Sequence, residues 1–115
     1  MARINLHDIE QYLIDFYELE PDQIAVLLTE MSGSIKKRLQ ELEMSLAEED
    51  PDHIATAAHA LKGTLLNFGL IDLAETCSII DKGSKEGSSS MQSISELFIT
   101  LRRTLIPVTE AVGGE

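Results

Sequence analysis

A histidine, a lysine and a glycine stand close together near the middle of the chain: His59, Lys62 and Gly63. Imidazole titrates near neutral pH, so its neutral, nucleophilic form is plentiful there. The neutral ring can attack a phosphoryl group, and a lysine ammonium one helical turn away can pair with the phosphoryl oxygens. The three residues could therefore hold a phosphoryl group on a ring nitrogen and give it up again.

The segment around these residues indicates that the ring of His59 lies in water. Its apolar positions share one face of a helix: Ile54, Ala58, Leu61 and Leu65. At about 100° per residue, His59 lies roughly 140° from the centre of that face. We expect Ala55 and Leu66 to project beside the ring and to form, with Gly63, a small patch that a partner contacts.

Two interpretations of an exposed His59 stay open at this point. It could be one of the solvent-exposed histidines that most proteins carry, or it could be a histidine that a partner must reach. Gly63 favours the second interpretation, because a glycine inside a helix costs about 1 kcal/mol relative to alanine and should have a reason. Close approach of another surface would be such a reason, since glycine has no side chain to obstruct it.

Five helices are expected to position these residues, and the whole chain, 1–115, is expected to form a single all-α domain. The expected bounds are about 6–17 for a short first helix and about 22–48, 51–68, 70–82 and 90–112 for four longer ones. Four amphipathic helices with short connections pack most simply as an antiparallel up-down four-helix bundle. The additional short N-terminal helix would then cap one end of that bundle.

Proline and glycine mark the expected helix ends. Pro51 suits the first turn of the helix that carries the histidine. Gly83 is expected to follow the end of the helix at 70–82. Pro107 is expected to kink the last helix or to end it near Thr104, because proline donates no backbone hydrogen bond.

Charge and composition argue against several classes of partner. The chain has 115 residues and a formal net charge of −11 at pH 7, so neither nucleic acid nor an anionic membrane surface is expected to bind it. It lacks an apolar run of membrane-span length and the N-terminal pattern of a signal peptide. A single cysteine cannot form an internal disulfide, so a cytoplasmic location is expected.

No metal or cofactor of its own is expected for the chain. His53 and His59 are six residues apart and face different sides of their helix, and no other cysteine or histidine pair has metal-ligand spacing. Nothing near His59 supplies an ATP site or a glycine-rich loop that could cradle phosphate. The residues therefore suit a carrier that depends on the catalytic machinery of its partners, rather than an enzyme in its own right.

The segment that begins at His59 resembles the signature of histidine-containing phosphotransfer (HPt) domains. It reads His59-Ala60-Leu61-Lys62-Gly63, then five residues, then Gly69. The similarity covers about 21–82 and rests on architecture beyond that. It implies a four-helix bundle that acts in a multistep phosphorelay of a two-component system. His59 would accept a phosphoryl group from the aspartyl phosphate of one receiver domain and pass it to the aspartate of another.

The resemblance also implies roles for the residues near the histidine. Lys62 would match the lysine that pairs with the phosphoryl group, and Gly63 the small residue that lets a receiver dock. Asp81 falls where the family often has a Gln or Glu that orients the ring. Leu66 stands where the family often has a small residue and would be a hydrophobic contact. The implied partners are response-regulator receiver domains, which would carry Mg²⁺, and/or a sensor histidine kinase.

Two alternative functions stay open from the sequence. The domain could be the phosphoacceptor of a chemotaxis-type histidine kinase, which an ATP-binding domain phosphorylates directly. It could also be a non-catalytic helical interaction module, for which His59 would be dispensable.

Overall fold

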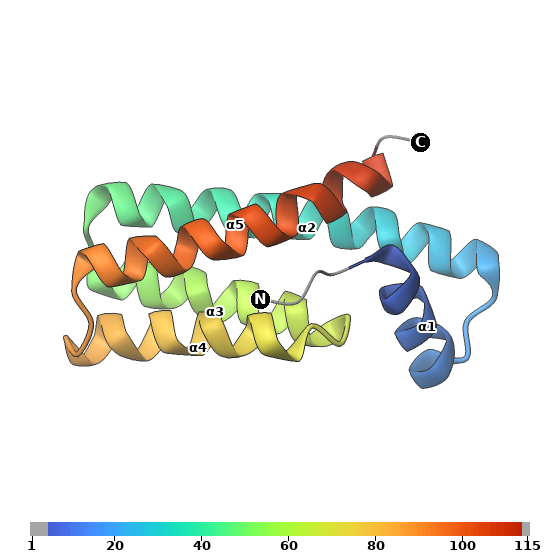
Figure 1. Ribbon diagram of the computed structural model, residues 1–115, viewed down its shortest axis with the longest axis horizontal. Helices are drawn as coiled ribbons and strands as arrows, with labels where there is room; N and C mark the ends of the chain where they lie inside the picture. The colour runs from blue at the N-terminus through green and yellow to red at the C-terminus, as the bar shows by residue number, and fades with distance from the viewer. Residues whose placement is uncertain (1–4, 114–115) are drawn as a thin grey trace.

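Five α-helices make up the computed structural model, which describes residues 5–113 (Figure 1). They are α1 (Leu6–Tyr17), α2 (Pro21–Glu48), α3 (Pro51–Asn67), α4 (Ile71–Glu86) and α5 (Met91–Gly113). Helices α2 to α5 run side by side along the long axis of the molecule, and α1 lies across one end of them (Figure 1). The predicted all-α fold, a four-helix bundle with an additional short N-terminal helix, is confirmed.

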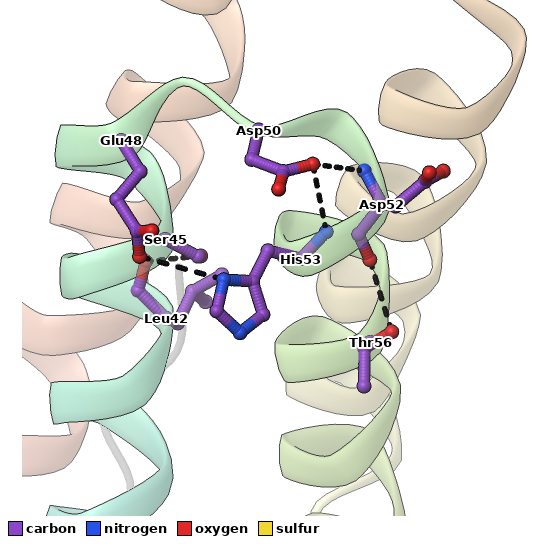
Figure 2. Close-up of polar contacts among 7 residues, drawn as sticks. All are labelled: Leu42, Ser45, Glu48, Asp50, Asp52, His53 and Thr56. Carbon is purple, nitrogen blue, oxygen red and sulfur yellow. Dashed lines mark hydrogen bonds and ion pairs between the residues drawn. The ribbon is translucent and has the colours of Figure 1, made fainter.

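The helix that carries His59 begins at a side-chain cap. Asp50 Oδ1 accepts hydrogen bonds from the backbone N–H groups of Asp52 at 3.1 Å and His53 at 3.4 Å (Figure 2). Pro51 occupies the first helical position, where its missing N–H would have had no partner inside the helix. This cap fixes the start of α3 at the expected residue, and with it the direction in which each later side chain points.

Helix α4 is one turn longer than expected, so the prediction that it closes before Gly83 is wrong. It continues to Glu86, and Gly87, with φ +65°, follows it in the left-handed conformation. The loop before α5 folds back onto Gly83. The backbone N–H of Ser89 donates to the Gly83 carbonyl at 3.4 Å, and the Ser89 side chain fills the space that a Cβ at Gly83 would need. Gly83 thus allows a close approach inside the helix rather than ending it.

Helix α5 runs from Met91 to Gly113, close to the expected bounds of about 90–112, and passes through Pro107. Of the two effects expected of Pro107, a kink or an end near Thr104, the early end is wrong. A proline inside a helix costs roughly 3 kcal/mol. Leu105 and Val108, on either side of the proline, are both buried, and burying each such side chain contributes about 1.5–3 kcal/mol. Packing on both sides of Pro107 therefore holds the helix together.

One apolar cluster joins all five helices. Helix α3 contributes the whole face that its sequence pattern predicts, and all four residues are fully buried: Ile54, Ala58, Leu61 and Leu65. With that face turned inward, the opposite face of α3 points to solvent. None of the described helices is long and apolar enough to cross a membrane.

Candidate functional site

His59 lies midway along α3, on the face that points away from the bundle. Its side chain is 75% exposed, as the helical phase predicts. Gly63, one turn further along, is exposed too, and a Cβ built there would meet no described heavy atom within 4 Å beyond its own helix. The small size of Gly63 therefore serves no packing inside the bundle, and the surface beside the ring is open.

Asp81 of α4 faces one nitrogen of the His59 ring. Asp81 Oδ2 lies 3.7 Å from His59 Nδ1, which is longer than a normal hydrogen bond, and the two groups form an ion pair when the ring is protonated. The Asp81 side chain is only 16% exposed. Because Nδ1 faces the carboxylate, Nε2 on the far side of the ring is the nitrogen available to an incoming group. The structure thus brings together the two residues that the sequence placed on different helices.

The other oxygen of Asp81 has a different neighbour. Asp81 Oδ1 is buried and has no hydrogen-bond partner among the described residues, and Lys85 Nζ lies 3.6 Å from it. Lys85 follows Asp81 by one turn of α4, and its side chain is 64% exposed. His59, Asp81 and Lys85 therefore form a row in which the carboxylate stands between the imidazole and the ammonium.

Lys62 is half-buried and lies in the groove between α3 and α4. The charge of Lys62 also affects the pKa of Cys77, a buried residue of α4. Burial raises the pKa of the Cys77 thiol to about 12, and the nearby charge of Lys62 acts in the opposite direction. Lys62 therefore lies on the side of α3 that faces α4, the helix that carries Asp81.

The structure does not place Ala55 on the exposed surface. Ala55 is 1% exposed, so the prediction that it projects beside His59 for a partner is wrong. Helices α3 and α4 run antiparallel with His59 opposite Asp81, which puts Ala55 level with the last turn of α4. That turn, 83–86, is the one that the sequence pattern left out.

Leu66 is 42% exposed, as predicted, and lines the groove between α3 and α4. This α3–α4 groove has a volume of about 480 Å³ and is lined by Lys62, Leu66, Ile71, Ala74, Glu75, Ser78, Ile79 and Lys82. Sequence reasoning missed Ile71 and Ile79, which are 58% and 53% exposed. The sequence could have indicated them, because they lie eight residues apart and outside the buried stripe of α4. The groove continues the exposed surface around His59 onto α4.

Gly69, the last residue of the sequence signature, has a structural role. Its φ is +74°. The backbone N–H of Gly69 donates to the Leu66 carbonyl at 3.2 Å, and the backbone N–H of Leu70 donates to the Leu65 carbonyl at 3.0 Å. This pair of hydrogen bonds ends α3 at a left-handed glycine. Three ring atoms of Tyr12 lie 2.5–2.8 Å from where a Cβ would stand. Gly69 therefore ends α3 and allows Tyr12 of α1 to pack against that end.

His53, the other described histidine of α3, lies in a different setting. Its Nδ1 lies 3.4 Å from Glu48 Oε1, across the turn between α2 and α3 (Figure 2). The two histidines thus face different sides of the helix, as their spacing predicts. Among residues 5–113, no group of three His, Cys, Asp or Glu side chains is arranged to hold a metal ion.

Comparisons with known proteins agree with this geometry. A search of curated protein sequences finds no significant match. Among solved structures, the chain is similar to histidine-containing phosphotransfer protein B (HptB) from Pseudomonas aeruginosa PAO1, with a TM-score of 0.75 and 20% sequence identity, over 98% of this chain and 93% of that one. At this identity the similarity shows a shared fold. The family model of the Hpt domain matches residues 26–105, which include His59 and every residue placed around it. The chain belongs to the Hpt domain family.

Proposed function

We propose that this protein is a phosphoryl carrier of a phosphorelay and that His59 is the residue phosphorylated. The observation that carries the proposal is an imidazole that is 75% exposed, with Nδ1 facing a carboxylate at 3.7 Å. Such a ring is held from one side and open to an incoming group on the other. Membership of the Hpt domain family supports histidine phosphotransfer as the chemistry.

The transfer requires little from this chain beyond the ring and its support. The lone pair of His59 Nε2 attacks the phosphorus of an aspartyl phosphate on a receiver domain. The N–P bond forms, the P–O bond to the aspartate breaks, and the aspartate leaves as a carboxylate. The ring keeps its proton on Nδ1, and Asp81 stabilises the positive charge that the ring then carries. In the onward step the N–P bond breaks and a second receiver aspartate takes the phosphoryl group.

The remaining charge on the phosphoryl oxygens is met by two cations in this proposal. Lys62, one turn from His59 on α3, would pair with them as a mobile point charge. Mg²⁺ bound by the receiver would supply the rest, so that no cofactor or metal of this chain is involved. The chain is then a transfer intermediate rather than an enzyme, and its partners carry the catalytic machinery.

The receiver is proposed to dock on the outer face of α3 and along the α3–α4 groove. Gly63 leaves room beside the ring for the receiver backbone. Leu66, Ile71 and Ile79 add exposed apolar surface along the α3–α4 groove, which Lys62, one turn from His59, also lines. Single exposed apolar residues are normal on proteins, whereas a cluster beside a nucleophile marks a contact site.

The experiment is label transfer from a panel of phosphorylated receiver domains to three proteins: wild type, His59→Gln and His53→Gln. His53 is the matched control because it is an exposed histidine on the same helix. We expect acid-labile, base-stable label on wild type and His53→Gln and none on His59→Gln. Label that persists on His59→Gln would refute the assignment of the phosphorylated residue.

The same proteins separate the alternative functions. Label that arrives on His59 only from an ATP-dependent kinase domain would make the chain the phosphoacceptor of a chemotaxis-type histidine kinase. Binding to receivers with no label from either donor, and no effect of His59→Gln, would make it an interaction module.

A further inference from the structure

We propose that Lys85 is a positioning residue for this chemistry. It holds the carboxylate of Asp81 in place, so that Oδ2 faces Nδ1 of the His59 ring and Nε2 is left to the incoming group. The proposal rests on the function proposed for His59 and deepens it. It is carried by two distances, 3.7 Å from His59 Nδ1 to Asp81 Oδ2 and 3.6 Å from Asp81 Oδ1 to Lys85 Nζ.

A carboxylate can orient the imidazole only if the carboxylate itself is held. Asp81 Oδ2 lies 3.7 Å from His59 Nδ1, too far for a normal hydrogen bond, so this contact does not fix the Asp81 side chain by itself. A second group must therefore hold the other oxygen of Asp81, and Lys85 is in that place.

Lys85 also fixes the conformation of the carboxylate. Asp81 Oδ1 is buried and lacks a hydrogen-bond partner among the described residues, so the ammonium 3.6 Å away is the group that compensates it. An acidic residue four positions before a lysine is the favourable order on a helix. With Oδ1 turned toward Lys85, Oδ2 is left to face the ring.

The extra turn of α4 makes this arrangement possible. Lys85 lies beyond Gly83, where the sequence pattern had the helix end, and it reaches Asp81 only because α4 stays helical to Glu86. The loop before α5 contacts this extra turn through Ser89, at Gly83.

The other charges around the ring provide the control. Lys62 lies on α3, as His59 does, and Lys82 lies on α4. Both lysines line the α3–α4 groove. On the α2 side of α3, Arg38 and Glu41 pair with each other at 2.9 Å and largely compensate. Lys82 is the matched control for Lys85, since it carries the same charge on the same helix, next to Asp81 in sequence.

The test measures chemical phosphorylation of His59 by phosphoramidate, which needs no protein partner. His59 Nε2 attacks the phosphorus, the P–N bond of the reagent breaks, and ammonia leaves. The rate is followed by ³¹P NMR between pH 5 and 9 for wild type, Lys85→Gln, Lys85→Arg and Lys82→Gln. Removal of Lys85 leaves Asp81 Oδ1 without its neighbouring ammonium, so the carboxylate no longer holds the ring in one orientation.

We expect Lys85→Gln to slow phosphorylation of His59 by about twofold, because Asp81 loses the ammonium that holds its carboxylate in place. A twofold loss corresponds to about 0.4 kcal/mol, which is within the usual range for an exposed ion pair. Lys85→Arg should restore the rate, and Lys82→Gln should change it less. Melting temperatures should not change, because Lys85 is largely exposed.

A double variant decides whether Lys85 acts through Asp81. In an Asp81→Asn background, Lys85→Gln should have no further effect on the rate, because no carboxylate is left to hold. An equal loss of rate in both backgrounds, or no loss in either, would overturn the proposal. These outcomes are distinct from failure of the proposed function, since receivers that do not transfer label leave the phosphoramidate profiles unaffected.

Discussion

Gly63 offers a test that separates folding from function at one position. A Cβ added there meets open space, and the residue lies inside α3 on its exposed face. Gly63→Ala should therefore raise the free energy of unfolding by about 0.5–1 kcal/mol, the usual gain for this change inside a helix. For a domain of this size the melting temperature should rise by roughly 2–6 °C. Gly63→Gln should also be stabilising, because glutamine is a far better helix former than glycine.

The same glutamine should slow phosphoryl transfer, because its side chain stands next to His59 on the surface that a receiver must approach. We expect receiver-to-His59 transfer to fall by at least about tenfold, as a loss of about 1.4 kcal/mol of binding to the transition state would produce. Phosphorylation by the small reagent phosphoramidate should be unchanged. Urea unfolding gives the stability, and single-turnover label transfer gives the rate.

Gly33 is the matched control for Gly63. It also lies inside a helix in open space, but on α2. Gly33→Ala and Gly33→Gln should raise stability as the changes at Gly63 do and should leave transfer at the wild-type rate. If Gly63→Gln transfers as fast as wild type, the docking argument fails. If Gly63→Ala lowers stability while Gly33→Ala raises it, the space beside His59 is not open.

Three further predictions follow from the same surfaces. Gly69→Ala should lower the free energy of unfolding by more than about 2 kcal/mol, because it adds a clash with Tyr12 to the left-handed backbone cost of about 1–2 kcal/mol. Gly87→Ala, with open space around it, should show only the backbone cost in the same urea titration. Ala55→Asp should destabilise the fold by about 3 kcal/mol or more, since it buries an unpaired charge, and retention of wild-type stability would contradict its burial. Ile79→Asp should keep the melting temperature yet slow receiver transfer, whereas Ile99→Asp, an equally exposed isoleucine on α5, should not.

The parts of this structure that the sequence predicts well are those controlled by nearby residues. The start of α3 follows from the side chain of Asp50 and from Pro51, which act within the first turn. Once that start is fixed, the direction of His59 follows from the helical repeat alone. The exposed ring and the buried apolar face of α3 were therefore predictable, and so was the position of Leu66.

The parts that the sequence mispredicts depend on contacts between distant residues. Glycine is typical of a helix end, but Gly83 lies inside α4, where the Ser89 side chain of the following loop fills the space that a Cβ would need. Proline typically breaks a helix, but burial of Leu105 and Val108 offsets the cost of Pro107. In both cases tertiary packing outweighs a local preference of a few kcal/mol.

These errors were not confined to helix ends, because the last turn of α4 shapes the site. Ala55, which the helical phase of α3 alone would leave beside His59, is buried and lies level with the last turn of α4. The same turn carries Lys85 to within 3.6 Å of Asp81. The predicted helix end at 82 left this turn out, and the prediction assigned Ala55 to the partner surface. The aspartate behind His59 can be found by counting residues, but the charge it presents to the imidazole depends on the turn that follows it.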